Sequence, residues 1–274
     1  MYSLNELTRK ASEVRLNLIR MFSFGKVHHF GGSLSCADIL TCLYFYKMRY
    51  SKELMDDPTR DRFIMSKGHS VPTQYVILGM LGVLPMDELK TIKSLGTRLQ
   101  GHPDMLKTPG IEAPTGSLGM GLSYANGIGL AGRYDGLNFN IFLVLGDGEM
   151  QEGQNWEAAM TTSQYGLNNV CAIVDYNKFQ SQGCTDEMMC LEKLTDKWQA
   201  FGWNSFEIDG HNVGEICTAL DKLDGNNDKP IAIVANTVKG KGVSFLENSY
   251  KYHNYKLTEE EYRRAEREIL EGLS

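Results

Sequence analysis

Two runs of apolar residues, at positions 140–145 and 170–175, constrain the fold of this 274-residue chain more than any other feature. Such runs, without alternation of apolar and polar residues, are typical of strands that are buried on both faces of a parallel sheet. The segment between them, 153–165, has a helical pattern. Together the three segments predict one strand-helix-strand unit.

The same alternation extends along the rest of the chain. Further strands are predicted at 62–66, 205–208 and 231–235. Helices are predicted at 3–24, from a capping segment at 35–38 to Met48, at 73–81, at 213–223 and at 258–270. No linker or repeat interrupts this pattern. We therefore expect a single α/β domain over residues 1–274, with a doubly wound, mainly parallel sheet.

Composition excludes several classes of protein. The chain is 42% hydrophobic and 23% charged, which is typical of a globular domain. Its net charge of −6 provides no positive field for nucleic acid or anionic lipid. Six cysteines without a C-x-x-C pair indicate neither a zinc module nor a disulfide scaffold. The charged N-terminal segment and the lack of an apolar run of about 20 residues predict a cytoplasmic protein without a membrane partner.

A glycine-flanked aspartate, Asp147, follows the first apolar run in the sequence Gly146-Asp-Gly-Glu149. Ligands of open α/β sheets bind at the carboxyl ends of the strands, where a glycine turn lets backbone N–H groups approach a phosphate. A carboxylate at such a turn repels a phosphate unless a cation lies between them. Asp147 therefore predicts a bound Mg²⁺ or Ca²⁺ ion that bridges to a diphosphate.

Asn177 and Phe179 follow the second apolar run and offer further oxygen ligands, an amide oxygen and a backbone carbonyl. About 30 positions separate Asp147 from Asn177, which is the length of one strand-helix-strand unit and brings the two strand ends side by side. The alternative is structural, with Gly-Asp-Gly as a tight turn and Asn177 as a helix cap.

Gly146-Asp-Gly148 followed by Asn177 matches the thiamine diphosphate motif, and the chain resembles the amino-terminal, diphosphate-binding domain of transketolase. The resemblance implies a thiamine diphosphate cofactor and transfer of a two-carbon ketol unit from a ketose, or its phosphate, to an aldose acceptor. It covers almost the whole chain through the segments His29-Phe-Gly-Gly-Ser-Leu-Ser35, Ser66-Lys-Gly-His69, Gln100-Gly-His-Pro-Asp104, Thr108-Pro-Gly-Ile-Glu-Ala-Pro-Thr-Gly-Ser-Leu-Gly119, Gly146-Asp-Gly-Glu-Met-Gln-Glu152, Ile208-Asp-Gly-His211 and Lys239-Gly-Lys-Gly242.

The resemblance also implies which residues hold the cofactor. The metal ion would be bound by Asp147, Asn177 and the carbonyl of Phe179. Gly148 would pack under the diphosphate. The full set of cofactor-binding residues implied by the family is His69, Gly116, Leu118, Asp147, Gly148, Asn177 and His253.

Four residues match catalytic positions of the family. His29 and His102 would hydrogen-bond sugar hydroxyls and assist proton transfers, and His253 would lie near the reacting centre. Glu152 would link two active sites across a dimer. Its alternative is a carboxylate that stabilises a helix N-terminus. The sequence supports His102 because it follows a glycine in a loop, and because imidazole titrates near neutral pH.

The second half of the family's active site has no counterpart in this chain. In the family, that half carries the carboxylate that activates the cofactor and most of the arginines that contact the sugar phosphate. The loop Gln180-Ser-Gln182-Gly183 also differs from the family's Ile-Asp-Gly. We therefore expect one subunit of a split transketolase, paired with a carboxy-terminal subunit that carries the pyrimidine-binding domain, in an α2β2 heterotetramer. Ordinary sugar phosphates and sulfo- or deoxy-sugars all remain open as substrates.

Two other functions remain as alternatives. The α subunit of a 2-oxo acid dehydrogenase E1 component shares the metal motif, although the segment Ala113-Pro-Thr-Gly-Ser117 favours transketolase. A non-catalytic regulatory or assembly protein could retain the same fold. Gly127-Ile-Gly-Leu-Ala-Gly132 matches a dinucleotide-binding pattern, but no strand precedes it, so it predicts close helix packing instead. His28 is expected to be structural, and for His211 the structural and functional interpretations stand equal.

Overall fold

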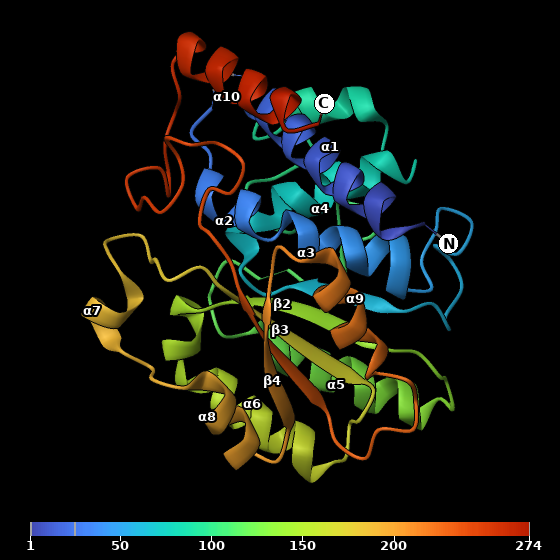
Figure 1. Cartoon of the computed structure of the whole chain (residues 1–274). Coiled ribbons are helices and arrows are strands. Elements are labelled where there is room, and N and C mark those ends of the chain that lie inside the picture. Colours follow the sequence, from blue (N-terminus) through green and yellow to red (C-terminus); the bar gives the residue numbers. More distant parts are fainter. Residues whose placement is uncertain (1, 25, 274) are drawn as a thin grey trace.

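The computed structural model describes residues 2–24 and 26–273 and contains a five-stranded sheet (Figure 1). All neighbouring strands are parallel, in the order β1-β2-β3-β5-β4, which confirms the predicted doubly wound α/β class. The strands are β1 (Arg62–Met65), β2 (Ile141–Gly146), β3 (Val170–Tyr176), β4 (Asn204–Asp209) and β5 (Ile231–Asn236).

Alternate residues of the inner strands face two different hydrophobic clusters. In β2, Phe142 and Val144 belong to one cluster, whereas Ile141, Leu143 and Leu145 belong to the other. Helices cover both faces of the sheet, so neither set of side chains reaches water. This is why the sequence of the strand is apolar at every position from Ile141 to Leu145.

The helices form one layer on each face of the sheet, above and below it in the view of Figure 1. The upper layer contains α1 (Leu4–Phe22), α2 (Phe30–Ser35), α3 (Ala37–Cys42), the π-helical turn η1 (Leu43–Lys47), α4 (Val71–Met80), the 3-10 helix η3 (Met86–Thr91), α9 (Val213–Asp221) and α10 (Glu259–Glu271). The lower layer contains α5 (Gly121–Tyr134), α6 (Gly153–Gln164) and α8 (Leu194–Ala200). Three short helices lie near the ends of strands or in loops, η2 (Gly68–Ser70), η4 (Gly148–Gln151) and α7 (Thr185–Met189).

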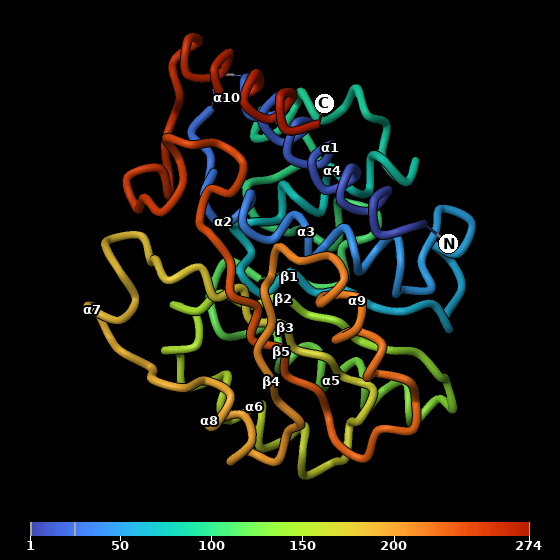
Figure 2. The backbone as a smooth tube through the Cα atoms, in the orientation of Figure 1, coloured from blue at the N-terminus to red at the C-terminus, as the bar shows by residue number. Residues whose placement is uncertain are grey.

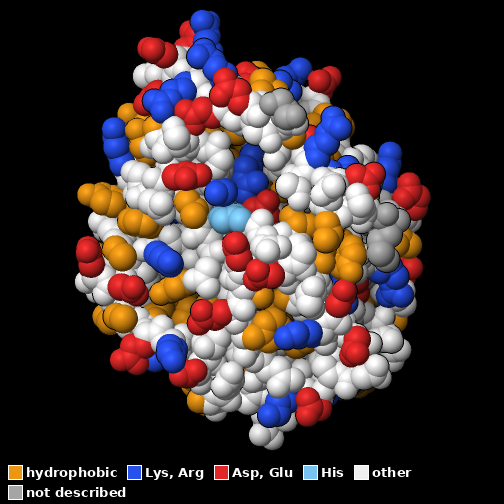
Figure 3. Space-filling view, in the orientation of Figure 1, with side chains coloured by type: hydrophobic (Ala, Val, Ile, Leu, Met, Phe, Trp, Pro, Cys, Tyr) orange, Lys and Arg blue, Asp and Glu red, His pale blue; other side chains and the backbone are white. Residues whose placement is uncertain are grey.

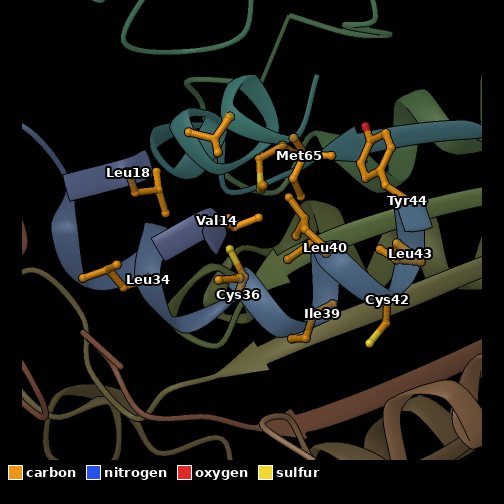
Figure 4. Packing of buried hydrophobic residues seen from close by; sticks show 14 of the residues in the cluster. Val14, Leu18, Leu34, Cys36, Ile39, Leu40, Cys42, Leu43, Tyr44 and Met65 are labelled. Atoms are coloured by element: carbon orange, nitrogen blue, oxygen red, sulfur yellow. The ribbon is translucent and has the colours of Figure 1, made fainter. Parts of the chain in front are cut away.

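The upper layer is packed around apolar side chains of α1, α2 and α3. Figure 4 shows Val14 and Leu18 of α1 beside Leu34, Ile39 and Leu40. All five side chains are completely buried. The upper layer therefore has its own core, separate from the cluster under the sheet.

The helix predicted from the capping segment 35–38 starts earlier than expected. Helix α2 begins at Phe30, and Cys36 separates it from α3. Ser35 caps neither helix, because its hydroxyl donates to the buried carboxylate of Asp175 (2.6 Å). The sequence around Ser35 has the pattern of a helix N-cap, but the Ser35 hydroxyl forms a tertiary hydrogen bond with Asp175 instead.

Helices α1 and α10 lie side by side although they come from opposite ends of the chain (Figures 1 and 2). Both begin with the predicted capping box, at Ser3 and Thr258. The hydroxyl of Tyr262 donates to the carbonyl of Phe22, which fixes α10 on α1. Among residues 2–24 and 26–273, no helix is both long and apolar enough to cross a membrane.

Asp175, at the end of β3, is fully buried and joins four parts of the fold. Its carboxylate accepts hydrogen bonds from Ser35 of α2, from Lys67 (2.5 Å) after β1 and from Thr237 after β5. Lys67 is 1% exposed, and its ammonium also donates to the carbonyl of Gly32 (2.7 Å). Burial favours the neutral acid, but the charge of Lys67 and these hydrogen bonds lower the pKa of Asp175.

The glycine-rich stretch in α5, for which close helix packing is predicted, comes close to the segment before β2 at Gly132. A Cβ atom at Gly132 would lie 2.5 Å from the ring of Phe139, at the approach to β2. A Cβ atom at Gly127 would meet nothing within 4 Å. The close approach of α5 to Phe139 therefore requires glycine at position 132 but not at position 127.

Replacing Lys67 with methionine would leave the Asp175 carboxylate buried without its counter-charge. We expect Lys67→Met to lower the free energy of unfolding by about 3–5 kcal/mol, measured by urea denaturation followed by circular dichroism. The double variant Lys67→Met/Asp175→Asn removes both charges and should recover part of the loss. If Lys67→Met is as stable as the wild type, the buried pair is not an anchor of the fold.

Two alanine substitutions in α5 should have opposite effects on stability. Gly132→Ala should lower the free energy of unfolding by about 1–3 kcal/mol because the new methyl group overlaps Phe139. Gly127→Ala should raise it by up to about 1 kcal/mol, since alanine favours the helix and meets no neighbour. Thermal denaturation of both variants checks the pair, and the reverse order of melting temperatures would contradict the packing described above.

Candidate functional site

Asp147 lies where β2 leads into the short helix η4 and is 2% exposed. Its carboxylate accepts hydrogen bonds from the backbone N–H groups of Gly148 (2.8 Å) and Lys178 (2.6 Å) and from the hydroxyl of Thr185 (3.2 Å). Lys178 follows β3, so the two strand ends meet as the spacing predicts. Burial first, and then the negative charge of Asp175, raise the pKa of Asp147 to about 6.

Asn177 and Phe179 lie beside Asp147 on the segment that leaves β3. The amide nitrogen of Asn177 donates to Asp175 (3.0 Å), and its amide oxygen accepts from the N–H of Phe179 (3.2 Å). The bonds from Gly148 to Asp147 and from Phe179 to Asn177 are those of turns, whereas Lys178 and Thr185 bond Asp147 from more than 30 positions away. Turn geometry does not prevent metal binding, because a carboxylate and an amide oxygen each have further lone pairs.

A buried lysine that the sequence analysis did not single out, Lys239, completes this part of the site. It follows β5, is 1% exposed, and donates from its ammonium to the carbonyls of Phe179 (2.9 Å) and Gln180 (3.0 Å). It also lies 3.1 Å from Nδ1 of His253. Burial lowers the pKa of Lys239 to about 8. The available sequence signal was a lysine two or three residues after an apolar strand, which is also the position of Lys67.

The donor atoms at the strand ends suit a hard divalent cation. Asp147 offers a carboxylate, Asn177 an amide oxygen and Phe179 a carbonyl oxygen, and Mg²⁺ and Ca²⁺ prefer such oxygen ligands. Within residues 2–24 and 26–273, no three or more His, Cys, Asp or Glu side chains gather as a metal-binding group, so the donor set does not resemble a transition-metal site. The carbonyl of Phe179 already accepts from the ammonium of Lys239, which shows that this oxygen is oriented to bind a positive charge.

A cavity of about 190 Å³ opens beside these residues. Its lining combines glycine backbone with charged and imidazole side chains, and Leu118 provides an apolar wall. Gln180 borders it from the loop that departs from the family, with its side chain against Gly148, where a Cβ atom would lie 2.8 Å from Cγ of Gln180. The polar residues around the cavity include Lys67, His69, Asp147, Glu152, Asn177, Lys239 and His253.

Four of the predicted histidines come together next to the cavity. The ring centre of His29 lies 5.2 Å from that of His69, 5.4 Å from that of His253 and 6.0 Å from that of His102, and His69 and His253 are 5.1 Å apart. They come from four separate segments of the chain. Histidine atoms reach the surface near a recess in the middle of the face shown in Figure 3, with basic and acidic side chains around them.

Burial keeps these imidazoles neutral at neutral pH. It lowers the pKa of His29 to about 3 and that of His253 to about 4, with smaller contributions from neighbouring positive charges. The pKa values of His69 and His102 are lowered for the same main reason. A neutral imidazole has one donor and one acceptor nitrogen, which suits the alternating donors and acceptors of a polyol.

The loop that carries Gly116 and Leu118 is held by a buried glutamate, Glu149, which the sequence analysis left without a role. One carboxylate oxygen of Glu149 accepts from the hydroxyl of Ser66 and the N–H of Gly119 (2.9 Å), and the other accepts from the N–H of Gly146 (2.9 Å). Gly116 lies against His102, 3.7 Å from its ring at the Cβ position. The structure thus brings both predicted loop residues to the edge of the site.

The remaining predicted residues divide between site and core. Glu152 is exposed at the N-terminal end of α6, lines the cavity and makes no capping hydrogen bond. His28 is completely buried and stacks on Phe22 at 4.5 Å, outside the histidine cluster. His211 bonds Asp38 through Nδ1 (2.7 Å) and accepts the N–H of Val238 at Nε2 (2.8 Å), which gives it a structural role.

Comparisons with known proteins identify the family of this chain. Residues 8–270 match the family model described as transketolase, thiamine diphosphate binding domain. A 6-deoxy-6-sulfo-D-fructose transketolase subunit from Clostridium sp. (strain MSTE9) is 44% identical over 265 residues, which cover 96% of this chain and 96% of the relative. An apulose-4-phosphate transketolase subunit from Phocaeicola vulgatus is 40% identical and is covered to 95%, against 97% of this chain.

Longer transketolases match over part of their length only. The human transketolase is 34% identical over 91% of this chain, but the match covers 40% of the human protein. The crystal structure of transketolase from Campylobacter jejuni superposes with a TM-score of 0.90 at 28% identity, over 98% of this chain and 43% of that one. The chain therefore belongs to the transketolase family, and its residues 8–270 match the thiamine diphosphate-binding domain of that family.

Proposed function

We propose that this chain is the amino-terminal subunit of a two-chain transketolase, which transfers a two-carbon ketol unit from a ketose to an aldose with a carboxy-terminal partner subunit. The observation that carries the proposal is that Asp147, Asn177 and Phe179 line one cavity with His69 and His253, next to which His29 and His102 lie. The 2-oxo acid dehydrogenase alternative is not favoured, since the relatives that span the chain are named transketolase subunits. A non-catalytic role is disfavoured because the oxygen ligands and histidines are all present.

The diphosphate end of the cofactor would be held at the strand ends. Asp147, Asn177 and the Phe179 carbonyl would bind Mg²⁺ or Ca²⁺, and the ion would join the diphosphate to the protein. Gly148, against which the side chain of Gln180 packs in this structure, would lie under the diphosphate. The ammonium of Lys239, placed on the Phe179 carbonyl, would supply a second positive charge. When bound, thiamine diphosphate supplies the nucleophilic carbon and the electron sink of the reaction.

The histidines would orient the sugar and move protons. His29 and His102, whose ring centres lie 6.0 Å apart, would hydrogen-bond the substrate hydroxyls. His69 and His253 lie nearer to the cavity, where His253 would face the reacting centre and His69 the cofactor. Because burial keeps the imidazoles neutral, each would present one donor and one acceptor nitrogen to the hydroxyls, and would assist proton transfers through these hydrogen bonds. Gly116 and Leu118 would contact the cofactor rings from the loop that Glu149 holds.

The site is one wall of an active site, and the partner subunit would supply the other. In the family, the carboxylate that activates the cofactor lies on the second half. An α2β2 heterotetramer would place Glu152, exposed at the edge of the cavity, between two active sites. We also propose that residues 1–274 act as a single domain and that the assembly works in the cytoplasm. Its substrates would be a ketose and an aldose, free or phosphorylated.

Removing the charge at Asp147 tests the metal site. Asp147→Asn and Asn177→Ala should each weaken Mg²⁺-dependent binding of thiamine diphosphate by about a hundredfold, since each removes a direct ligand. Isothermal titration with and without EDTA measures this on the isolated chain. Asp186→Ala, an exposed aspartate nearby on α7, is the control and should bind as the wild type does. Binding that does not depend on metal would overturn the site.

Activity should require the partner subunit. The chain alone should bind cofactor and show no detectable ketol transfer, whereas its complex with the carboxy-terminal subunit from the same organism should transfer the ketol unit to an aldehyde. Co-purification followed by a transfer assay checks both statements. Full activity of the chain alone would exclude the two-chain arrangement, and decarboxylation of a 2-oxo acid by the complex would restore the dehydrogenase alternative.

A further inference from the structure

The turn at residues 238–242, which follows β5 and carries Lys239, is fixed on both sides of the lysine. The backbone N–H of Val238 donates to Nε2 of His211 (2.8 Å), and the N–H of Gly240 donates to the carbonyl of Gly31 (3.1 Å). A Cβ atom at Gly31 would lie 2.6 Å from Cγ of Lys239, so the lysine stem passes directly over this glycine. Of the two hydrogen bonds, the one to His211 is made by a side chain, and a substitution can therefore remove it.

The bond from Val238 determines the tautomer of His211. A backbone N–H can only donate, so Nε2 of His211 is the unprotonated nitrogen of the ring. Nδ1 then carries the proton and donates to the carboxylate of Asp38 (2.7 Å). His211 is therefore held as one neutral tautomer between a carboxylate and a backbone N–H. A flipped ring would lose both bonds.

Asp38 is held in turn by Arg15 of α1. Both residues are buried, and two nitrogens of the guanidinium donate to the two carboxylate oxygens of Asp38. Burial favours the neutral acid, but the charge of Arg15 and these hydrogen bonds lower the pKa of Asp38 to about 2. Arg15 also packs against the turn itself, since a Cβ atom at Gly242 would lie 3.0 Å from its Cδ. A row of three side chains, Arg15, Asp38 and His211, therefore joins the upper helical layer to the turn after β5.

The turn places the ammonium of Lys239 among three acceptors that come from other parts of the chain. These are the carbonyls of Phe179 (2.9 Å) and Gln180 (3.0 Å) and Nδ1 of His253 (3.1 Å). An ammonium group has three donor hydrogens, so the three acceptors match its full capacity. Hydrogen bonds weaken steeply when their geometry is lost, and a small displacement of the turn would therefore weaken all three contacts.

We propose that His211 is a positioning residue for the cofactor site. Through the N–H of Val238, it holds the turn so that the ammonium of Lys239 faces the diphosphate of the bound cofactor. The inference rests on the proposed function and adds to it a residue that touches neither cofactor nor substrate. Lys239 lines the cavity, whereas His211 does not. The effect of His211 on cofactor binding therefore passes through Lys239.

Two substitutions of His211 separate its two hydrogen bonds. His211→Asn places an amide nitrogen where Nδ1 lies and can still donate to Asp38, but it has no atom at the position of Nε2. His211→Gln reaches the position of Nε2, where its amide oxygen can accept from Val238. Isothermal titration of the isolated chain with thiamine diphosphate and Mg²⁺ compares them. His211→Asn should raise Kd by about fivefold to twentyfold, and His211→Gln should stay within about twofold of the wild type.

A double-mutant cycle tests whether His211 acts through Lys239. Lys239→Met alone should raise Kd for thiamine diphosphate by about tenfold to a hundredfold, since a charge-assisted hydrogen bond to the diphosphate is lost. Adding His211→Asn to Lys239→Met should cause no further loss, because no ammonium remains to be positioned. Losses that multiply in the double variant would overturn the positioning role.

Amide hydrogen exchange of the cofactor-free chain, followed by NMR, tests the contact itself. The N–H of Val238 should exchange at least about tenfold faster in His211→Asn than in the wild type, and His211→Gln should restore slow exchange. Glu207→Gln, at an exposed position of β4, is the control and should change neither this exchange nor cofactor binding. Faster exchange throughout the sheet in His211→Asn would mean a general loss of stability and would contradict a local role.

The binding data also separate this inference from the proposed function. A wild-type chain that binds no thiamine diphosphate in the presence of Mg²⁺ would refute the proposed function. Equal affinity of the wild type and His211→Asn, or no recovery in His211→Gln, would refute the positioning role of His211 and leave the proposed function as it is.

Discussion

The buried ion pair between Lys67 and Asp175 is the contact on which the arrangement of the site depends. Asp175 binds groups that follow β1 and β5 and a hydroxyl of α2, so one carboxylate fixes three chain segments at the carboxyl edge of the sheet. Asp175 also accepts a hydrogen bond from the amide nitrogen of Asn177, and its negative charge contributes to the raised pKa of Asp147. A buried pair of this kind adds little stability compared with an apolar pair of the same shape, but it allows only one geometry. The positions of the proposed cofactor-binding residues Asp147 and Asn177 depend on this ion pair.

Much of the fold could be predicted because its signals are local. The apolar runs of β2 and β3 and the capping boxes at Ser3 and Thr258 need no knowledge of distant residues. The start of α2 could not be predicted, because the hydroxyl of Ser35 is used by Asp175, 140 positions away. Only the family resemblance predicted that the four histidines would lie at one site. Their convergence depends on loops with no periodic pattern, which sequence alone does not place.

The residues that the sequence missed share one property, which is a charge in a buried position. Lys67, Lys239 and Glu149 are each at most 2% exposed, although most lysines and glutamates lie at the surface. Composition and periodicity treat such residues as solvent-facing. Each is satisfied by partners from other segments, Glu149 by two backbone N–H groups and the hydroxyl of Ser66. Burying a charged group costs free energy, and such groups often lie at ligand-binding sites. Lys67, Glu149 and Lys239 all line the same cavity, which agrees with this tendency.

The pairing of α1 with α10 has a consequence for synthesis on the ribosome. The strands of the sheet are all present once residue 236 has been made, but α10, whose Tyr262 hydroxyl donates to the carbonyl of Phe22 in α1, is made later. The segment with His253 and the bridge between His28 and Tyr255 also arrive in this last stretch. Until residues 253–262 have been made, the sheet can therefore be complete while α1 lacks its neighbour α10 and the histidine cluster lacks His253.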